Sequence, residues 1–164
     1  MLTICGWYFR QFSISPTSLL QAKGDTFSSP EVRQGRGAES AEHQALKRWV
    51  REHAEELEDF GEFEPGKNGA VLSSRDRLDV LFDNARQRLA VEVKTSKCSE
   101  DELMRGVCQC VKYRAVLRAE QLAMRQVPNG EAVLICPRAP GKTTKALIKR
   151  LNVNFHQVPV DAER

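Results

Sequence analysis

Apolar residues recur at helical spacing over residues 39–57. Spacing of three and four residues places these side chains on one stripe, which predicts an amphipathic helix with one buried side. The stripe consists of Leu46, Trp49, Val50, His53 and Leu57. A second helix is expected over 99–124, because Ser99 followed by Glu102 forms a capping box. A third helix is expected over 142–151.

Between these helices lie short runs that alternate between apolar and polar residues or are wholly apolar. Such runs predict β-strands, and a wholly apolar run indicates a strand buried on both faces. The expected strands are 71–73, 77–83, 88–94, 132–136 and 153–160, with a turn-rich loop over 61–69. The order α-β-β-β-α-β-α-β indicates an α/β sandwich built on a mixed sheet.

The second and third of these strands flank a turn that follows Asn84, and they can be placed in register. If the turn is centred between residues 85 and 86, one side of the hairpin is wholly apolar and faces the core. That side pairs Leu78 with Val93, Val80 with Val91 and Phe82 with Leu89. The other side places Asp79 directly opposite Glu92.

Two carboxylates opposite each other in a sheet repel. The repulsion is relieved by a raised pKa on one acid, by a cation between the acids, or by neighbouring Lys and Arg. Lys94 follows Glu92 by two residues and so lies on the same face. A divalent cation with oxygen ligands fits this arrangement, with Mg²⁺ as the expected ion and Mn²⁺ as its substitute. The alternative is an ordinary solvated patch in which Arg77 balances the charge of Asp79 and Glu92.

Two acids near the start of the first helix, Glu39 and Glu42, fall on its apolar stripe. A carboxylate on a buried face costs several kcal/mol unless it is paired or binds a metal. One of them is therefore a candidate third acid, with Glu42 preferred. The alternative is that both lie in the first helical turn, where the helix dipole favours acids.

The helix over 99–124 presents Arg105, Gln109 and Lys112 on one face, at positions i, i+4 and i+7. These side chains are candidates for contacts to nucleic-acid phosphates or to metal-bound water. The alternative is a solvated helix face. Tyr113 is expected in the core, and His43 is expected to be structural.

Composition and charge narrow the class of protein. The chain has 164 residues, of which 41% are hydrophobic and 29% charged, as in ordinary globular domains. Its apolar runs are too short to cross a membrane. The net charge is +3, but residues 105–164 carry 11 Lys and Arg against 4 Asp and Glu, or +7, which favours a polyanionic partner. Five cysteines without CxxC spacing indicate free thiols and a cytoplasmic protein.

Residues 1–37 are interpreted as an N-terminal extension and linker, because Ser, Pro and Gly punctuate them, and residues 38–164 as the single domain. Within the domain, the segment Pro140-Gly141-Lys142-Thr143 is similar to a phosphate-binding loop. Cys136 stands where that motif needs a glycine. The segment is therefore expected to be a strand–helix turn that opens a basic helix face.

Asp79, the tripeptide Glu92-Val93-Lys94 and the later helix with Gln109 and Tyr113 resemble the PD-(D/E)xK, or restriction-endonuclease-like, nuclease superfamily. The resemblance covers roughly residues 38–160, with Leu78 where the motif has proline. It implies a three-layer sandwich with a central mixed β-sheet, in which an αβββαβ core is followed by a C-terminal helix and strand.

The resemblance also implies roles for individual residues. Asp79 and Glu92 would bind magnesium, with the carbonyl of Val93 as a further ligand. Lys94 would assist the attacking water. Glu42 would complete the metal shell, and Gln109 would lie near the site.

The expected function is therefore that of a magnesium-dependent nuclease that hydrolyses phosphodiester bonds, with DNA favoured over RNA. Arg105, Gln109 and Lys112 would position the nucleic-acid backbone. The alternative is a catalytically inactive nucleic-acid-binding module of the same fold. Cutting both strands of a duplex would suit a homodimer.

Overall fold

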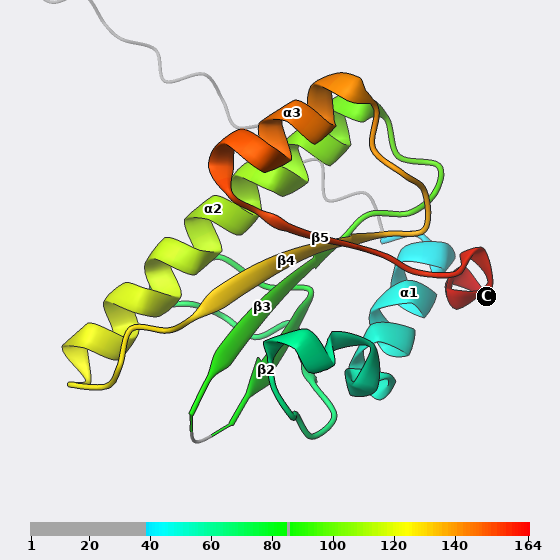
Figure 1. Ribbon diagram of the computed structural model, residues 1–164. Helices are drawn as coiled ribbons and strands as arrows, with labels where there is room; N and C mark the ends of the chain where they lie inside the picture. Colours follow the sequence, from blue (N-terminus) through cyan, green and yellow to red (C-terminus); the bar gives the residue numbers. More distant parts are fainter. Residues whose placement is uncertain (1–38, 85) are drawn as a thin grey trace, which may run out of the picture. The chain divides into compact units, whose positions relative to one another are not determined.

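A computed structural model describes residues 39–84 and 86–164 of the chain (Figure 1). The extension expected over residues 1–37 lies outside the described residues. The described part is built around a five-stranded sheet with the order β1-β2-β3-β4-β5. The strands are β1 (Lys67–Asn68), β2 (Val80–Asp83), β3 (Arg88–Val93), β4 (Glu131–Cys136) and β5 (Asn154–Gln157). The first three strands are antiparallel and the last three are parallel, which confirms the predicted mixed sheet.

The described residues form three α-helices, α1 (Ala41–Glu52), α2 (Glu100–Ala123) and α3 (Lys142–Leu151), and two 3₁₀-helices, η2 (Ala54–Phe60) and η3 (Val160–Glu163). The positions of α2 and α3 confirm the prediction, and both hydrogen bonds of the capping box between Ser99 and Glu102 are present. The first helix ends earlier than expected. The backbone of His53 (φ −113°, ψ 60°) leaves the helical region there, and the chain continues as η2.

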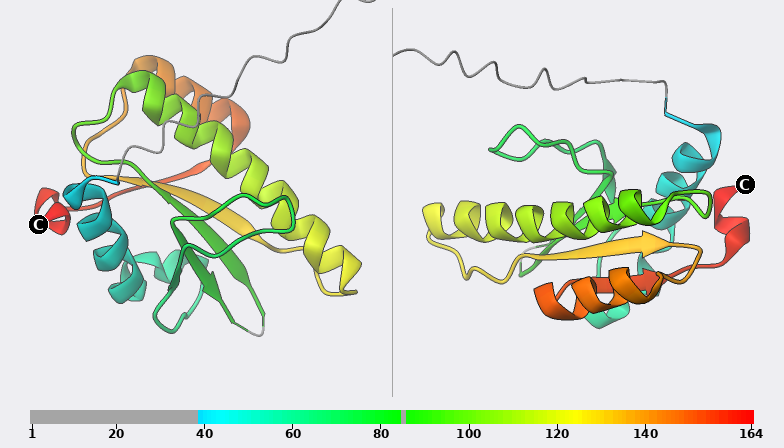
Figure 2. Two further views of the ribbon diagram at one scale, coloured as in Figure 1. Left: turned by 180° about the vertical axis from the view of Figure 1, so that it is seen from behind. Right: turned by 90° about the horizontal axis from the view of Figure 1, so that it is seen from above.

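Helices cover both faces of the sheet, which gives the predicted three layers (Figures 1 and 2). On one face, α2 and α3 pack over Leu81, Ala90 and Leu134. On the other face, α1, η2 and η3 pack over residues that include Phe82 and Val91. Successive residues of β2 and β3 therefore face different helices. The sequence argument identified only one of these two cores.

The predicted register of β2 and β3 is confirmed from Val80–Val91 to Asp83–Arg88. The ladder ends there, one pair before Asp79 and Glu92. The reason is that residues 67–79 fold back on themselves: for example, the N–H of Leu78 donates to the carbonyl of Ala70 at 2.8 Å. As a result, Leu78 packs under α2 while Val93 packs under α1, and the predicted Leu78–Val93 pair is wrong.

Three strand boundaries also differ from the prediction. The segment 71–73 forms a single bridge, between Val71 and Arg77, instead of a strand. The strand β1 lies in the segment expected as a loop. The last strand is shorter than 153–160, because Pro159 caps the start of η3. Among the described residues, no helix has both the length and the apolar character needed to cross a bilayer.

Candidate active site

Asp79 lies just before β2 and is held by groups from two elements. Its Oδ2 accepts a hydrogen bond from the backbone N–H of Val93 in β3 at 3.0 Å. Its Oδ1 lies 3.3 Å from Nε2 of His43 and 3.6 Å from Nζ of Lys47, both on α1. Burial raises the pKa of this carboxyl, but the contacts with His43, Val93 and Lys47 together outweigh burial and lower it. Asp79 is therefore ionised at neutral pH.

Glu92 lies on β3 and behaves in the opposite way. Its side chain is buried, and burial, followed by repulsion from Asp79, raises its pKa to about 7 against the attraction of Lys94. Nζ of Lys94 lies 2.5 Å from Oε1 of Glu92, and the hydroxyl of Tyr113 donates to Oε2 at 3.2 Å. The electrostatic conflict expected between the two acids is therefore present, although the acids are not a ladder pair.

Lys94 follows β3 directly and reaches back to Glu92. Burial lowers the pKa of its ammonium. The negative charges of Glu92 and Asp79 raise this pKa by more than burial lowers it, so the net shift is upward. Lys94 therefore stays protonated at neutral pH and acts as a positive charge. Gly106 on α2 leaves room for its stem, because a Cβ there would lie 3.3 Å from Cε of Lys94.

The helix α1 and the residue before its N-cap contribute a row of three side chains, with His43 and Lys47 on the helix and Glu39 just ahead of it. Oε1 of Glu39 lies 3.0 Å from Nε2 of His43 and 2.9 Å from Nζ of Lys47. One potential ligand atom each from Glu39, His43 and Asp79 lie within 4.8 Å of one another. The four-residue spacing of His43 and Lys47 places these two side chains on one helix face, and this is the signal in the sequence that identifies the row. Lys47 is not among the site residues expected from the sequence.

Glu42 pairs with a different group. Its Oε1 lies 2.5 Å from Nζ of Lys97, which lies in the loop after β3, and both side chains are largely exposed. The hydrogen bond from Lys97 is the main cause that lowers the pKa of Glu42 to about 2. Glu39, which precedes α1, is the acid that the structure groups with Asp79 and His43, so both Glu39 and Glu42 stay candidates for the third acid, with Glu39 favoured by this placement.

Of the α2 residues singled out in the sequence, Gln109 has the closest connection to the two acids. Its amide Nε2 donates to the hydroxyl of Tyr113 at 3.2 Å, and that hydroxyl donates in turn to Glu92. Tyr113 is buried, as expected. The hydrogen-bond chain from Gln109 through Tyr113 fixes the orientation of the Glu92 carboxylate.

Two adjoining hollows flank Lys94. One, of about 320 Å³, lies between the start of α1 and the loop after β3, and Glu39 and His43 line it. The other, of about 910 Å³, is lined by α2 residues that include Arg105 and Gln109, and by Leu147 of α3. Lys94 and Glu102 line both hollows.

Two other motifs are accounted for locally. The third α2 candidate, Lys112, forms an ion pair with Asp76 at 2.7 Å, so its charge is already partnered.

At the start of α3, the carboxylate of Glu100 accepts hydrogen bonds from the N–H of Gly141 at 3.2 Å and from the hydroxyl of Thr144 at 2.5 Å. An acid thus takes the place that a phosphate takes in a phosphate-binding loop, and the expected strand–helix turn is confirmed.

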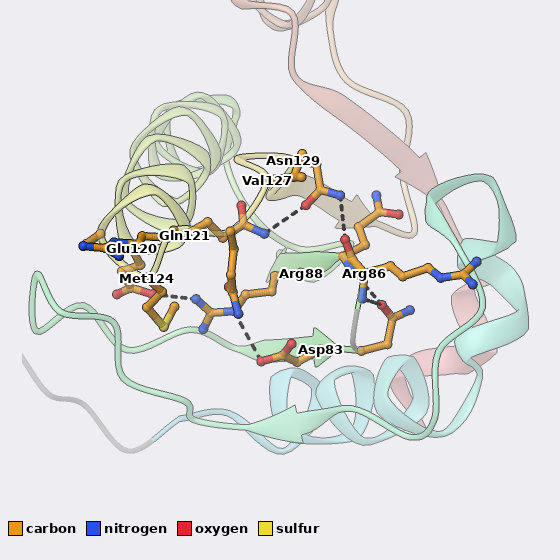
Figure 3. A pocket seen from close by; sticks show the side chains of 13 residues that line it. Asp83, Arg86, Arg88, Glu120, Gln121, Met124, Val127 and Asn129 are labelled. Atoms are coloured by element: carbon orange, nitrogen blue, oxygen red, sulfur yellow. Dashed lines mark hydrogen bonds and ion pairs between the residues drawn. The ribbon is translucent and has the colours of Figure 1, made fainter.

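A further hollow, of about 1040 Å³, lies at the other end of α2 beside the β2–β3 hairpin (Figure 3). The guanidinium of Arg88 spans it, with Nε 3.3 Å from Asp83 and Nη1 2.7 Å from Glu120. Glu120 is eleven residues beyond Gln109, or about 16 Å along the helix axis. None of the residues that hold Asp79 or Glu92 lines this hollow.

The donor atoms around Asp79 fit a divalent cation. The carboxylates of Asp79 and Glu39 offer hard oxygen ligands, which suit Mg²⁺ and Mn²⁺, whereas Glu92 is not part of this group of ligand atoms and contacts Lys94 and Tyr113. Nε2 of His43 adds a nitrogen donor, which favours Mn²⁺ over Mg²⁺. The group of Val93 that contacts Asp79 is its N–H, so the carbonyl of Val93 stays a predicted ligand.

No protein-family model matches the sequence, and no curated protein matches it. Solved structures do match. One is an XisH family protein from Nostoc punctiforme PCC 73102, which is 20% identical, with a TM-score of 0.51 over 76% of this chain and 94% of that chain. Another is an fdxN element excision controlling factor protein from Anabaena variabilis, which is 21% identical, with a TM-score of 0.49 over 75% of this chain and 93% of that chain. The described part of this chain thus shares its α/β fold, a mixed sheet between helices, with an XisH family protein.

Proposed function

We propose that this chain is a divalent-metal-dependent nuclease that hydrolyses phosphodiester bonds in DNA. The observation that carries the proposal is the pair of acids with opposed pKa shifts, Asp79 lowered and Glu92 raised to about 7, in contact with a protonated Lys94. Neighbouring titratable groups whose pKa values are pushed apart are typical of sites that carry out chemistry. Lys94, which contacts Glu92, lines two hollows, and a substrate in either hollow would reach Lys94 first.

The position of these residues in the fold supports membership of the PD-(D/E)xK superfamily. Asp79 lies at the start of β2, Glu92 and Lys94 lie at the end of β3, and α2 follows with Gln109. The elements α1, β1 to β3, α2 and β4 reproduce the αβββαβ order. Cleavage of both strands of a duplex calls for two such sites, as in a homodimer.

Asp79 and Glu92 would hold a Mg²⁺ or Mn²⁺ ion, with the Val93 carbonyl, Glu39 and His43 as further ligands. When bound, a divalent cation polarises a phosphoryl oxygen and lowers the pKa of a coordinated water. The protein's own contribution is to orient these ligands by hydrogen bonds. For Asp79 the N–H of Val93 does so, and for Glu92 the hydroxyl of Tyr113 does so.

Lys94 supplies positive charge next to the phosphate. Its raised pKa keeps the ammonium charged, so it stabilises negative charge that develops on the phosphoryl group and orients a water by hydrogen bonding. Gln109 and Arg105 line the same hollow as Lys94 and would position the DNA backbone. Lys112 would contribute only after exchanging its partner Asp76 for a phosphate.

A second candidate is a nucleic-acid-binding module of the same fold without catalysis. It is favoured by the observation that each acid already has an ammonium partner: Lys94 on Glu92 at 2.5 Å, and Lys47 on Asp79 at 3.6 Å. A site compensated in this way is stable without a cation.

Cleavage of plasmid and branched DNA by the full chain, with Mg²⁺ and with Mn²⁺, separates the two candidates. The nuclease should convert substrate, and Asp79→Asn or Lys94→Ala should lower the rate by roughly 100-fold or more, since each removes charge that stabilises the transition state. Asp59→Asn is the matched control, because it makes the same change at an exposed position of η2. Equal rates in all four proteins would remove the nuclease assignment. Salt-sensitive binding without any product would establish the second candidate.

A further inference from the structure

The exposed side of α3 carries an uncompensated positive charge. The helix contains four basic residues and no acidic one. All four are exposed: Lys142, Lys145, Lys149 and Arg150. Within residues 39–84 and 86–164, none of the four takes part in an ion pair. This set of four residues is called the α3 basic face below.

Basic residues close to α3 in the fold are partnered, which sets the α3 basic face apart. Arg138 pairs with Glu100 at 2.6 Å. Arg114 of α2 donates to the carbonyl of Leu151 at 3.0 Å, at the end of α3. Four like charges on ten residues repel each other, and an acidic counter-ion supplied by a partner would relieve that repulsion.

The opposite side of α3 fixes the direction of this face. Leu147, Ile148 and Leu151 pack against the core under α2, and Thr144 is fully buried. The α3 basic face is therefore on the solvent side of the helix, as the exposure of its four residues shows, and α3 itself lies beside α2 (Figures 1 and 2). Because its apolar side is already used in the core, α3 has no apolar face to insert into a membrane surface.

The helix that carries the α3 basic face reaches the candidate site through Leu147, and none of the four basic residues lines the hollow there. Leu147 lines the 910 Å³ hollow together with Arg105 and Lys94. Asp101 and Glu102 at the start of α2 also line this hollow and would repel phosphates there. Contacts to a polyanion that enters the hollow therefore fall on its basic lining residues, Lys94 and Arg105, and the α3 basic face can contact the part of the polyanion that extends beyond the hollow.

The side chains present favour a duplex over a single strand. Proteins that bind single strands stack bases on aromatic side chains. Neither the sequence of α3 nor the described lining of this hollow contains an aromatic residue. Basic side chains without stacking platforms suit the phosphates of a double helix.

We infer that the α3 basic face binds the phosphate backbone of double-stranded DNA and holds the duplex so that one strand lies along the hollow at Lys94. The position of the scissile strand rests on the proposed function. The binding itself does not, because it can be measured in EDTA.

The test is binding of a fluorescent 25-base-pair duplex to the full chain in EDTA, measured by anisotropy over a range of salt concentrations. Replacing Lys142, Lys145 and Lys149 together by Gln should weaken binding by about tenfold or more at low salt and reduce the salt slope by about 2 to 3, since each lost phosphate contact removes about 0.9 from the slope. The matched control replaces Arg48, Lys67 and Arg125 by Gln, which removes the same charge at three other exposed positions. It should change binding by less than about threefold.

Equal losses in the two triple variants, or no loss in the α3 variant, would overturn the inference. So would equal affinity of the wild type for a single strand of the same length. The α3 variant should keep its metal-induced rise in melting temperature, which shows that the candidate site is intact. DNA binding through α3 without any cleavage would sink the proposed function and leave this inference standing. If the wild type cleaves DNA but the α3 variant binds DNA as tightly as the wild type does, the inference is overturned and the proposed function stands.

Discussion

The ammonium of Lys94 lies 2.5 Å from Oε1 of Glu92, beneath the edge of α2. This contact holds a carboxyl that burial and the charge of Asp79 would otherwise drive to its neutral form. It also keeps Lys94 protonated. The two residues thus maintain each other's charge, and a cation or a phosphate that enters the site competes for one member of this pair.

Stability without divalent cations should depend on the protonation of Glu92. Its pKa of about 7 lies above the ordinary value of 4.5, so the folded state binds this proton more tightly than the unfolded state. The resulting contribution to the free energy of unfolding is fully present below pH 4.5 and is lost as pH rises through 7. Glu92→Gln, which cannot ionise, should therefore gain stability relative to wild type between pH 5 and pH 8 in EDTA. Urea unfolding at the two pH values measures this gain.

Glu42→Gln is the control for this pH dependence. The pKa of Glu42 is lowered to about 2, so its contribution to stability is present above pH 4.5 and is lost only at more acidic pH. The difference between this variant and wild type should be flat from pH 5 to pH 8. If the difference in free energy of unfolding between Glu92→Gln and wild type is also constant from pH 5 to pH 8, the pKa of Glu92 is not raised in the folded protein.

Gly106→Ala should damage the site by displacing Lys94. A Cβ at residue 106 would lie 2.8 Å from Cδ1 of Leu134 and 3.3 Å from Cε of Lys94. We expect a loss of about 1–3 kcal/mol of stability from overpacking, together with a drop in DNA cleavage. Gly130→Ala places a Cβ 2.8 Å from Cβ of Leu117, away from Lys94. It should cost similar stability in thermal unfolding but leave the cleavage rate of the folded protein unchanged.

The metal-induced rise in melting temperature should identify the third acid. Glu39 shares the cluster with His43 and Asp79, whereas Glu42 is paired with Lys97. Glu39→Gln and Asp79→Asn should each reduce the rise produced by Mn²⁺, because a lost ligand weakens binding to the folded state. Glu42→Gln should not. Reduction by Glu42→Gln alone would restore Glu42 as the third acid.

The C-terminal turn should stabilise the loop that follows Lys94. The carboxylate of Glu163 in η3 accepts hydrogen bonds from the N–H of Ser96 at 2.5 Å and from its hydroxyl at 2.7 Å. Hydrogen bonds to a charged acceptor contribute about 1.5–3 kcal/mol each. Glu163→Ala should therefore increase hydrogen exchange across residues 95–98. Asp161→Ala, at an exposed position of the same turn, should leave that exchange unchanged.

Most of the fold follows from local patterns in the sequence. The capping box at Ser99 fixes the start of α2, and the apolar pairs from Val80–Val91 onward fix the hairpin register. The failures come from contacts between distant residues. Nothing local shows that Ala70 pairs with Leu78, a contact that ends the ladder and turns Leu78 toward α2.

The sequence predicts contacts of the site between residues that are close in sequence. It does not predict contacts between residues from different helices and strands. The Glu92–Lys94 contact follows from a spacing of two residues at the end of β3, with Lys94 directly after the strand. The meeting of His43 with Asp79 depends on how α1 packs against the sheet, which periodicity alone does not determine. The same packing decides that Glu39 lies next to Asp79 while Glu42 lies next to Lys97.

The central claim is that Asp79 and Glu92 together hold a divalent cation beside Lys94. Anomalous scattering from crystals of the full chain grown with Mn²⁺ tests it most directly. The account predicts a manganese peak in contact with carboxylate oxygens of both Asp79 and Glu92, with the ammonium of Lys94 moved off Oε1 of Glu92. The absence of a peak at this place under saturating Mn²⁺, with Lys94 still bound to Glu92, would contradict it.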